Sequence, residues 1–135
     1  MQVQPYLFFD GRCEEALGFY CKALGGQVTA LMRYQDNPEP PPPGNTMAGD
    51  KIMHANLQIG AAQIMASDGQ RPGEGLFKGF ALSITAATAT QAQRLFDALA
   101  DGGHIQMPFG PTFFATPFGM VADRFGVSWM LVTNP

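Results

Sequence analysis

The sequence contains the same pattern twice, at an offset of seventy-seven residues. Residues 19–26 read Phe-Tyr-Cys-Lys-Ala-Leu-Gly-Gly, and residues 96–103 read Phe-Asp-Ala-Leu-Ala-Asp-Gly-Gly. The same offset places the apolar run Val3–Phe9 on Phe80–Ala86. A repeated unit usually buries its apolar face against a neighbouring copy. We therefore expect a duplicated fold, one sheet built from two halves, with the functional site between them.

Composition excludes two classes of partner. The 135 residues correspond to a single domain, here made of two halves at about 1–68 and 78–135, and 46% of them are hydrophobic. The formal net charge is −3 and no run of Lys or Arg occurs, so we expect no nucleic-acid binding. No stretch approaches the roughly 18 uninterrupted apolar residues of a membrane span, so we expect no membrane partner.

The two cysteines indicate the compartment. Cys13 and Cys21 lie on one predicted helix, where a rise of about 1.5 Å per residue separates them by about 12 Å, too far for a disulfide. Glu14 and Glu15 beside Cys13 oppose thiolate formation, so we do not expect a catalytic thiol. Free thiols, together with an N-terminus that lacks a basic leader, predict a cytoplasmic protein.

Hydrophobic periodicity predicts the order strand, helix, strand, strand, strand in each half. In the first half we expect a helix at Glu14–Leu24 and strands at Val3–Phe9, Gln27–Tyr34, Lys51–Ile59 and Ala62–Ala66. In the second half we expect a helix at Thr90–Ala100 and strands at Phe80–Thr85, His104–Met107, Met120–Asp123 and Val127–Val132. A linker at Asp68–Lys78 and a loop at Pro108–Phe118 complete the assignment.

The segment Asp36–Asp50 is predicted to be a long loop. It contains Pro38 and Pro40–Pro43, which neither a helix interior nor a sheet interior tolerates. Long loops of this kind are either functional or have no role. The sequence leaves open whether this one is a lid over a site or a simple insertion.

Six phrases in this order resemble the vicinal oxygen chelate superfamily, and within it the PhnB-like branch. They are Pro5-Tyr-Leu-Phe-Phe-Asp-Gly11, Ala16-Leu-Gly-Phe-Tyr20, Ile52-Met-His-Ala55, Met65-Ala-Ser-Asp68, Gly110-Pro-Thr-Phe-Phe114 and Asp123-Arg-Phe-Gly-Val-Ser-Trp-Met130. The superfamily includes glyoxalase I, bleomycin-resistance proteins and extradiol dioxygenases. The resemblance implies an α+β fold, in which duplicated βαβββ units form a curved mixed sheet with a concave pocket. It also implies a homodimer.

The resemblance further implies where a metal would bind. In metal-using relatives four side chains on the concave face hold a divalent ion, and their positions correspond here to Gln4, Met65, Ala81 and Met130. A hard divalent ion prefers carboxylate or imidazole ligands, which this set lacks. We therefore expect no metal. Members of the branch are sometimes described as methyltransferases, but this chain lacks the glycine-rich turn that usually holds S-adenosylmethionine, so we also expect no cofactor.

Strand alternation predicts the composition of a pocket. His54, Asn56 and Gln58 share one strand face, whereas Met53, Ala55 and Leu57 should pack under a helix. The same reasoning gives a set of ligand-binding candidates, which are Gln4, Tyr6, Phe8, Asn56, Gln63, Met65, Ser83 and Met130. Apolar walls with a few polar groups suit a small organic ligand. Asp68 follows the fourth strand, where it either orients His54 or caps the linker.

We interpret the chain as a metal-independent, PhnB-like protein that binds a small organic molecule. One alternative is a lyase, isomerase or dioxygenase-like enzyme that uses His54 and Gln4, with His54 as the general base because its unperturbed pKa is about 6.5. Another alternative is sequestration of an antibiotic. A further alternative is that His54 is an ordinary polar residue on a solvated sheet face. The ligand, the reaction and the dimer geometry do not follow from the sequence.

Overall fold

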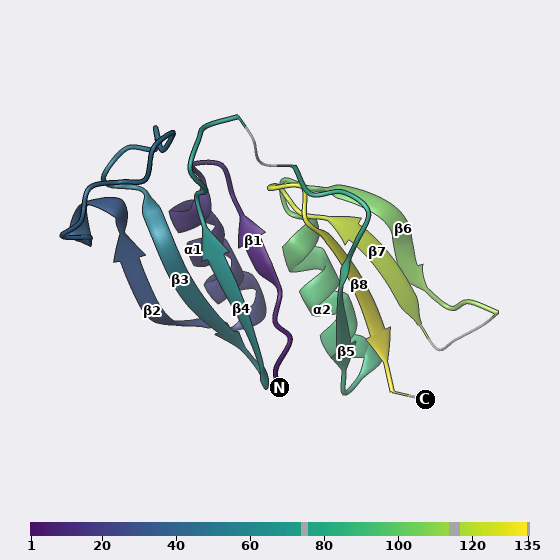
Figure 1. Cartoon of the computed structure of the whole chain (residues 1–135). Coiled ribbons are helices and arrows are strands. Elements are labelled where there is room, and N and C mark those ends of the chain that lie inside the picture. The colour runs from purple at the N-terminus through teal and green to yellow at the C-terminus, as the bar shows by residue number, and fades with distance from the viewer. Residues whose placement is uncertain (74–75, 114–116, 135) are drawn as a thin grey trace. The chain divides into compact units, whose positions relative to one another are not determined.

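The computed structural model describes residues 1–73, 76–113 and 117–134 (Figure 1). Contacts divide the chain into two compact units, Met1–Leu76 and Phe77–Pro135. Residues 74 and 75 of the predicted linker, and residues 114–116 of the predicted second-half loop, lie outside the described part. None of the helices in the described ranges is long and apolar enough to cross a membrane.

Unit 1 contains one helix and a four-stranded sheet. Its elements are β1 (Tyr6–Phe8), α1 (Cys13–Leu24), β2 (Gln27–Arg33), a short 3-10 helix η1 (Tyr34–Asp36), β3 (Ile52–Ile59) and β4 (Ala62–Ser67). The strand order is β1-β4-β3-β2, with β1 parallel to β4 and the other neighbours antiparallel. The sheet is therefore mixed, and its first and last strands in the chain lie side by side (Figure 1).

Unit 2 repeats this arrangement. Its elements are β5 (Leu82–Ala86), α2 (Ala89–Ala100), β6 (His104–Gly110), β7 (Phe118–Ala122) and β8 (Ser128–Thr133). The strand order β5-β8-β7-β6 matches that of unit 1, and β5 is parallel to β8. The predicted α+β fold of duplicated βαβββ units is confirmed. The hydrogen-bonded strands form two sheets, one in each unit, where we expected one sheet from two halves.

The helices differ by one residue from the predicted register. α1 spans residues 13–24 and α2 spans 89–100, an offset of seventy-six rather than seventy-seven residues. The buried side chains follow the same offset, because Tyr20 and Phe96 are both buried whereas Phe19 is only half-buried. Tyr20, not Phe19, is therefore the counterpart of Phe96. Each helix packs its apolar face on its own sheet.

The glycine doublets after the helices make two different contributions. Gly25 and Gly102 have φ angles of 67° and 76°, the left-handed conformation that commonly ends a helix. Gly103 has no room for a side chain, since an added Cβ would collide with the carbonyl oxygen of Ala122 on β7. The first glycine thus turns the chain, and in unit 2 the second lets it approach the neighbouring strand.

Strand β1 is shorter than predicted. It begins at Tyr6 rather than Val3, and Pro5 explains the difference because proline has no N–H to donate to a strand ladder. The Pro5 carbonyl still accepts a hydrogen bond from the Met65 amide at 3.0 Å. Gln4 therefore lies outside the strand, and the alternation argument that assigned it to the pocket does not apply to it.

Candidate functional site

One face of the unit 1 sheet carries the polar row predicted from the sequence. Strand pairing places Tyr6 opposite Met65 and Met65 opposite Asn56, and paired residues share a face. His54 lies on the same face, two residues before Asn56. α1 covers the other face of the sheet, where Leu7, Ala55 and Ala66 are buried (Figure 1). The helix and its apolar core thus leave the polar face open.

A chain of hydrogen bonds links three residues on this face. Tyr6 Oη lies 2.9 Å from His54 Nδ1, and His54 Nε2 lies 2.8 Å from Asn56 Oδ1. An amide oxygen only accepts, so His54 Nε2 carries a proton and donates it to Asn56. In the neutral imidazole Nδ1 is then the acceptor, and the Tyr6 hydroxyl donates to it. Asn56 thereby fixes the tautomer of His54.

Burial perturbs the hydroxyl of Tyr6. The pKa of Tyr6 is raised above its usual value, mainly by partial burial and then by the neighbouring Tyr34 and Cys13, while a hydrogen bond with Ser67 lowers it. A raised pKa keeps the phenol protonated at neutral pH. Tyr6 is therefore a hydrogen-bond donor in this site.

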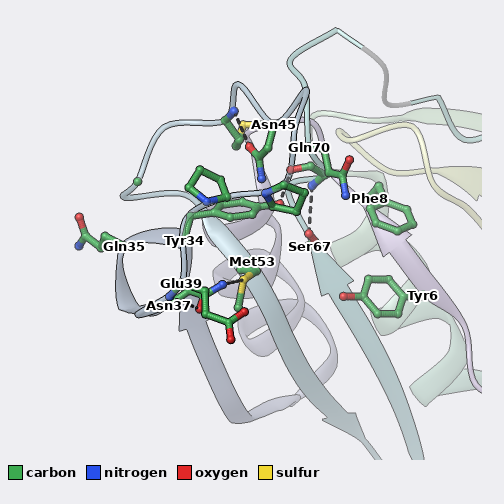
Figure 2. A pocket seen from close by; sticks show the side chains of 15 residues that line it. Tyr6, Phe8, Tyr34, Gln35, Asn37, Glu39, Asn45, Met53, Ser67 and Gln70 are labelled. Carbon is green, nitrogen blue, oxygen red and sulfur yellow. Dashed lines mark hydrogen bonds between the residues drawn. The ribbon is translucent and has the colours of Figure 1, made fainter.

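A cavity of about 560 Å³ opens beside Tyr6 (Figure 2). The sheet contributes its first wall through Tyr6, Phe8, Met53 and Ser67. The second wall comes from η1, the proline-rich loop and the start of the linker, through Tyr34, Gln35, Asn37, Glu39, Pro41, Pro42, Asn45, Met47, Gly49, Gly69 and Gln70. The proline-rich loop, whose role the sequence left open, thus forms one wall of this cavity.

Backbone hydrogen bonds hold this loop in place. The Thr46 amide donates to the Gln70 carbonyl at 2.8 Å, and the Gln35 amide donates to the Gly49 carbonyl at 2.9 Å. The hydroxyl of Tyr34 donates to the carbonyl of Gly69. The loop is therefore fastened both at its base and to the segment that follows β4.

Met53 lies in the cavity wall, and the prediction that it packs under the helix is wrong. Met32 pairs with His54, but the next residue, Arg33, pairs with Ile52, so Met53 is an extra residue in β3. Such a bulge breaks the strict alternation of side chains. The Met53 sulfur lies 3.9 Å from Asn37 Nδ2, beside Glu39 (Figure 2).

The other predicted binding residues lie in several places. Phe8 lines the cavity, whereas Gln63 pairs with Gln58 further along the sheet. Ser83 and Met130 pair with each other on the sheet of unit 2. His54 and Asn56 are not among the described lining residues, and His54 is linked to the lining by its hydrogen bond with Tyr6. Any role of these residues in binding or catalysis stays a prediction.

Sequence periodicity contains no direct signal for the loop residues that line the cavity. Tyr34, Asn45 and Gln70 become neighbours of the sheet through the hydrogen bonds of the loop, which sequence periodicity does not reveal. The proline run was the only hint, since prolines restrict a loop to fewer conformations.

Asp68 has a role that we did not predict. It is buried, and its two carboxylate oxygens accept hydrogen bonds from the amides of Cys13 at 2.8 Å and Ile52 at 2.7 Å. It therefore joins the start of α1 to the start of β3, and both proposed roles, orienting His54 and capping the linker, are wrong. Cys13 is fully buried beside it, and burial, then Asp68 and Glu14, raise the pKa of the thiol well above its usual value.

Comparison with known proteins identifies the family. The family model described as 3-demethylubiquinone-9 3-methyltransferase matches residues 1–132. The chain belongs to this family. Protein YjdN of Escherichia coli is 36% identical over 97% of this chain and 94% of its own length.

Solved structures share the fold of this chain. Protein PA1353 from Pseudomonas aeruginosa is 46% identical, with a TM-score of 0.85 over 99% of this chain and 98% of that one. A PhnB protein from Bacillus cereus is 27% identical, with a TM-score of 0.83 over 99% and 100%. Glyoxalase-related and bleomycin-resistance structures with lower identity share the fold. The chain is thus similar to a PhnB protein, and it shares its fold with glyoxalase-related proteins.

The residues present do not fit the cofactor that the family's description implies. A nucleotide-type cofactor such as S-adenosylmethionine usually needs a glycine-rich turn between a parallel strand and a helix. The turn from β1 into α1 reads Phe9-Asp10-Gly11-Arg12, with a single glycine. We derive no methyl-transfer step from this site.

A divalent metal does not fit either. The positions that the resemblance assigns to metal ligands hold Gln4, Met65, Ala81 and Met130, which offer one amide oxygen and two thioethers. Among the described residues, no group of three or more His, Cys, Asp or Glu side chains could hold an ion.

Proposed function

We propose that this protein binds a small organic molecule in the cavity of unit 1, without a metal. The main observation in support is the cavity itself. Its volume of about 560 Å³ falls in the range of roughly 300–1,000 Å³ that is typical of ligand pockets. Its lining combines aromatic, proline and methionine side chains with a few amides and one carboxylate. This mixture supports binding through apolar contact, with polar groups that orient the ligand.

The arrangement of the two walls also supports binding. One wall lies on a sheet that is packed against α1, and the other is a proline-containing loop fastened by backbone hydrogen bonds. A preformed site costs less ordering entropy when a ligand binds. Sequestration of an antibiotic would use the same cavity with no reaction. The homodimer and the cytoplasmic location implied earlier stay predictions.

Replacing Phe8 with alanine should weaken binding about tenfold, because an aromatic contact contributes roughly 0.5–1.5 kcal/mol beyond the area that it buries. Native mass spectrometry of the purified full chain would identify a co-purifying ligand, and calorimetry would give its affinity for each variant. Phe80→Ala is the matched control, since Phe80 is similarly exposed (44% against 50% for Phe8) but lies in unit 2. Equal affinities for Phe8→Ala and the unchanged protein would contradict the proposal.

The hydrogen-bonded chain favours one second candidate, an enzyme that uses acid–base chemistry. Tyr6 lines the cavity and His54 lies behind it, so the group that meets a substrate would be the Tyr6 hydroxyl. His54 would position that hydroxyl through the hydrogen bond at its Nδ1, and the proton that passes to a substrate oxygen would come from Tyr6. The raised pKa of Tyr6 suits a donor to a substrate oxygen better than a phenolate nucleophile.

For any substrate that turns over, Tyr6→Phe and His54→Asn should each lower kcat about 100-fold or more with little change in KM, because general acid–base groups contribute roughly 10²–10⁴-fold. His104→Asn is the control, since this exposed histidine lies on β6 in unit 2. Circular dichroism would check the fold. An unchanged kcat in His54→Asn would contradict the proposed acid–base chemistry but not the proposed binding function.

A further inference from the structure

We infer that the cavity of unit 1 takes planar aromatic molecules that carry no negative charge and present an acceptor oxygen to Asn45. This inference rests on the proposed binding function and specifies its ligand class. Three independent features of the lining carry it: the aromatic surface, an unpartnered amide donor and the sign of the charge.

The aromatic surface favours a flat ligand. Tyr6 and Phe8 stack with ring centroids 5.0 Å apart and an angle of 21° between their planes. Both are unusually exposed for aromatic side chains, at 38% and 50%, and they stand on the same side of the cavity in Figure 2. Tyr34, Pro41 and Pro42 also line the cavity. A lining rich in flat ring surfaces suits a planar aromatic ligand.

Asn45 supplies the donor. Its Oδ1 accepts a hydrogen bond from the Met47 amide at 3.0 Å, which fixes the orientation of the side-chain amide. Its Nδ2 is buried and has no hydrogen-bond partner within the described ranges. A buried donor without a partner is unfavourable, and a ligand oxygen that accepts from it would remove that cost. Asn45 lies in the cavity lining, above Tyr34 in Figure 2.

The charge of the lining disfavours anions. Among the described lining residues Glu39 is the charged side chain, and no Lys, Arg or His accompanies it. Arg71 follows the lining residue Gln70 in sequence, but its guanidinium packs beside Gly44, where Nη2 would lie 3.7 Å from an added Cβ. A carboxylate or phosphate ligand would therefore lose its hydration shell without gaining a cationic partner. Neutral and cationic ligands avoid this cost.

Three naphthalene probes of similar size test the ligand class. They are 2-acetylnaphthalene, which has an acceptor oxygen, 2-ethylnaphthalene, which has none, and 2-naphthoate, which is anionic. Titrations of the full chain by ligand-observed NMR should show the ketone binding about fivefold more tightly than the hydrocarbon and about tenfold more tightly than the carboxylate, as expected for one neutral hydrogen bond and one unfavourable charge.

Variants assign these preferences to residues. Asn45→Asp keeps the acceptor for the Met47 amide but removes the donor, so the ketone should lose its advantage over the hydrocarbon. Asn45→Ala should give the same result if the aspartate variant does not fold. Glu39→Gln should reduce the ketone's advantage over the carboxylate about threefold. Glu15→Gln, the same substitution at an exposed residue of α1 outside the lining, should not.

The experiment distinguishes failure of the ligand class from failure of the proposed binding function. Binding of 2-naphthoate as tight as that of the ketone would overturn the ligand class while leaving the binding function in place. A ketone advantage that survives in both Asn45 variants would overturn the role of Asn45. Binding of none of the three probes would count against the proposed function itself.

Discussion

Replacing Gly103 with alanine should lower the free energy of unfolding of unit 2 by about 3 kcal/mol, at the upper end of the cost of overpacking. The added Cβ would collide with the carbonyl oxygen of Ala122 and lie 3.0 Å from the Cα of Asp123. Both obstacles are backbone atoms, so relief requires β6 to move away from β7. Urea unfolding followed by the fluorescence of Trp129, the single tryptophan of the chain, would measure the change in unit 2.

Gly18→Ala is the control, and it should change stability in the opposite direction. Gly18 is exposed within α1, has a φ angle outside the left-handed region, and an added Cβ there would meet no atom within 4 Å. Alanine is the better helix former by about 1 kcal/mol, so this variant should stabilise unit 1. Circular dichroism would measure it. A stability of Gly103→Ala within about 1 kcal/mol of the unchanged protein would contradict the close approach of the two strands.

Replacing Asp68 with alanine should destabilise unit 1 by about 3 kcal/mol, because two buried amides, those of Cys13 and Ile52, would lose their acceptor. The stability of Asp68→Asn should lie between those of the unchanged protein and Asp68→Ala, since asparagine keeps one acceptor oxygen. Urea unfolding followed by far-ultraviolet circular dichroism would measure both variants.

Asp36→Ala is the matched control for Asp68. The Asp36 carboxylate also accepts a hydrogen bond from a backbone amide, that of Arg33 at 2.8 Å, but it is exposed. Water replaces the lost acceptor there, so the cost should stay at about 1 kcal/mol or below. Equal costs at Asp36 and Asp68 would show that burial does not determine the effect.

Sequence periodicity predicted those features of the fold that depend on neighbours in the chain. The helix bounds came within one residue, because glycines end or follow both helices and their apolar spacing is regular. Strand alternation placed Tyr6, His54 and Asn56 on one face correctly, because Met65 pairs with both Tyr6 and Asn56, and His54 lies two residues before Asn56. It failed at Met53, where the bulge breaks the alternation.

The cavity could not be predicted because distant residues create it. Its loop wall depends on bonds such as that from the Thr46 amide to the Gln70 carbonyl, twenty-four residues along the chain. The hydrogen bond from Tyr6 to His54 likewise joins residues forty-eight apart. Periodicity assigns a side chain to a face, but it does not say which loop covers that face.

The two helices differ in where the acceptor for their first amides lies in the sequence, and this difference affects the order in which the chain folds during synthesis. Thr88 accepts a hydrogen bond from Gln91, so α2 carries its cap within the residues that begin it. α1 has no such local side-chain cap. The Cys13 amide at its start donates instead to Asp68, fifty-five residues later in the sequence. On the ribosome, α1 would emerge long before its acceptor is made. Completion of unit 1 therefore depends on translation past β4, whereas α2 can begin as soon as it emerges.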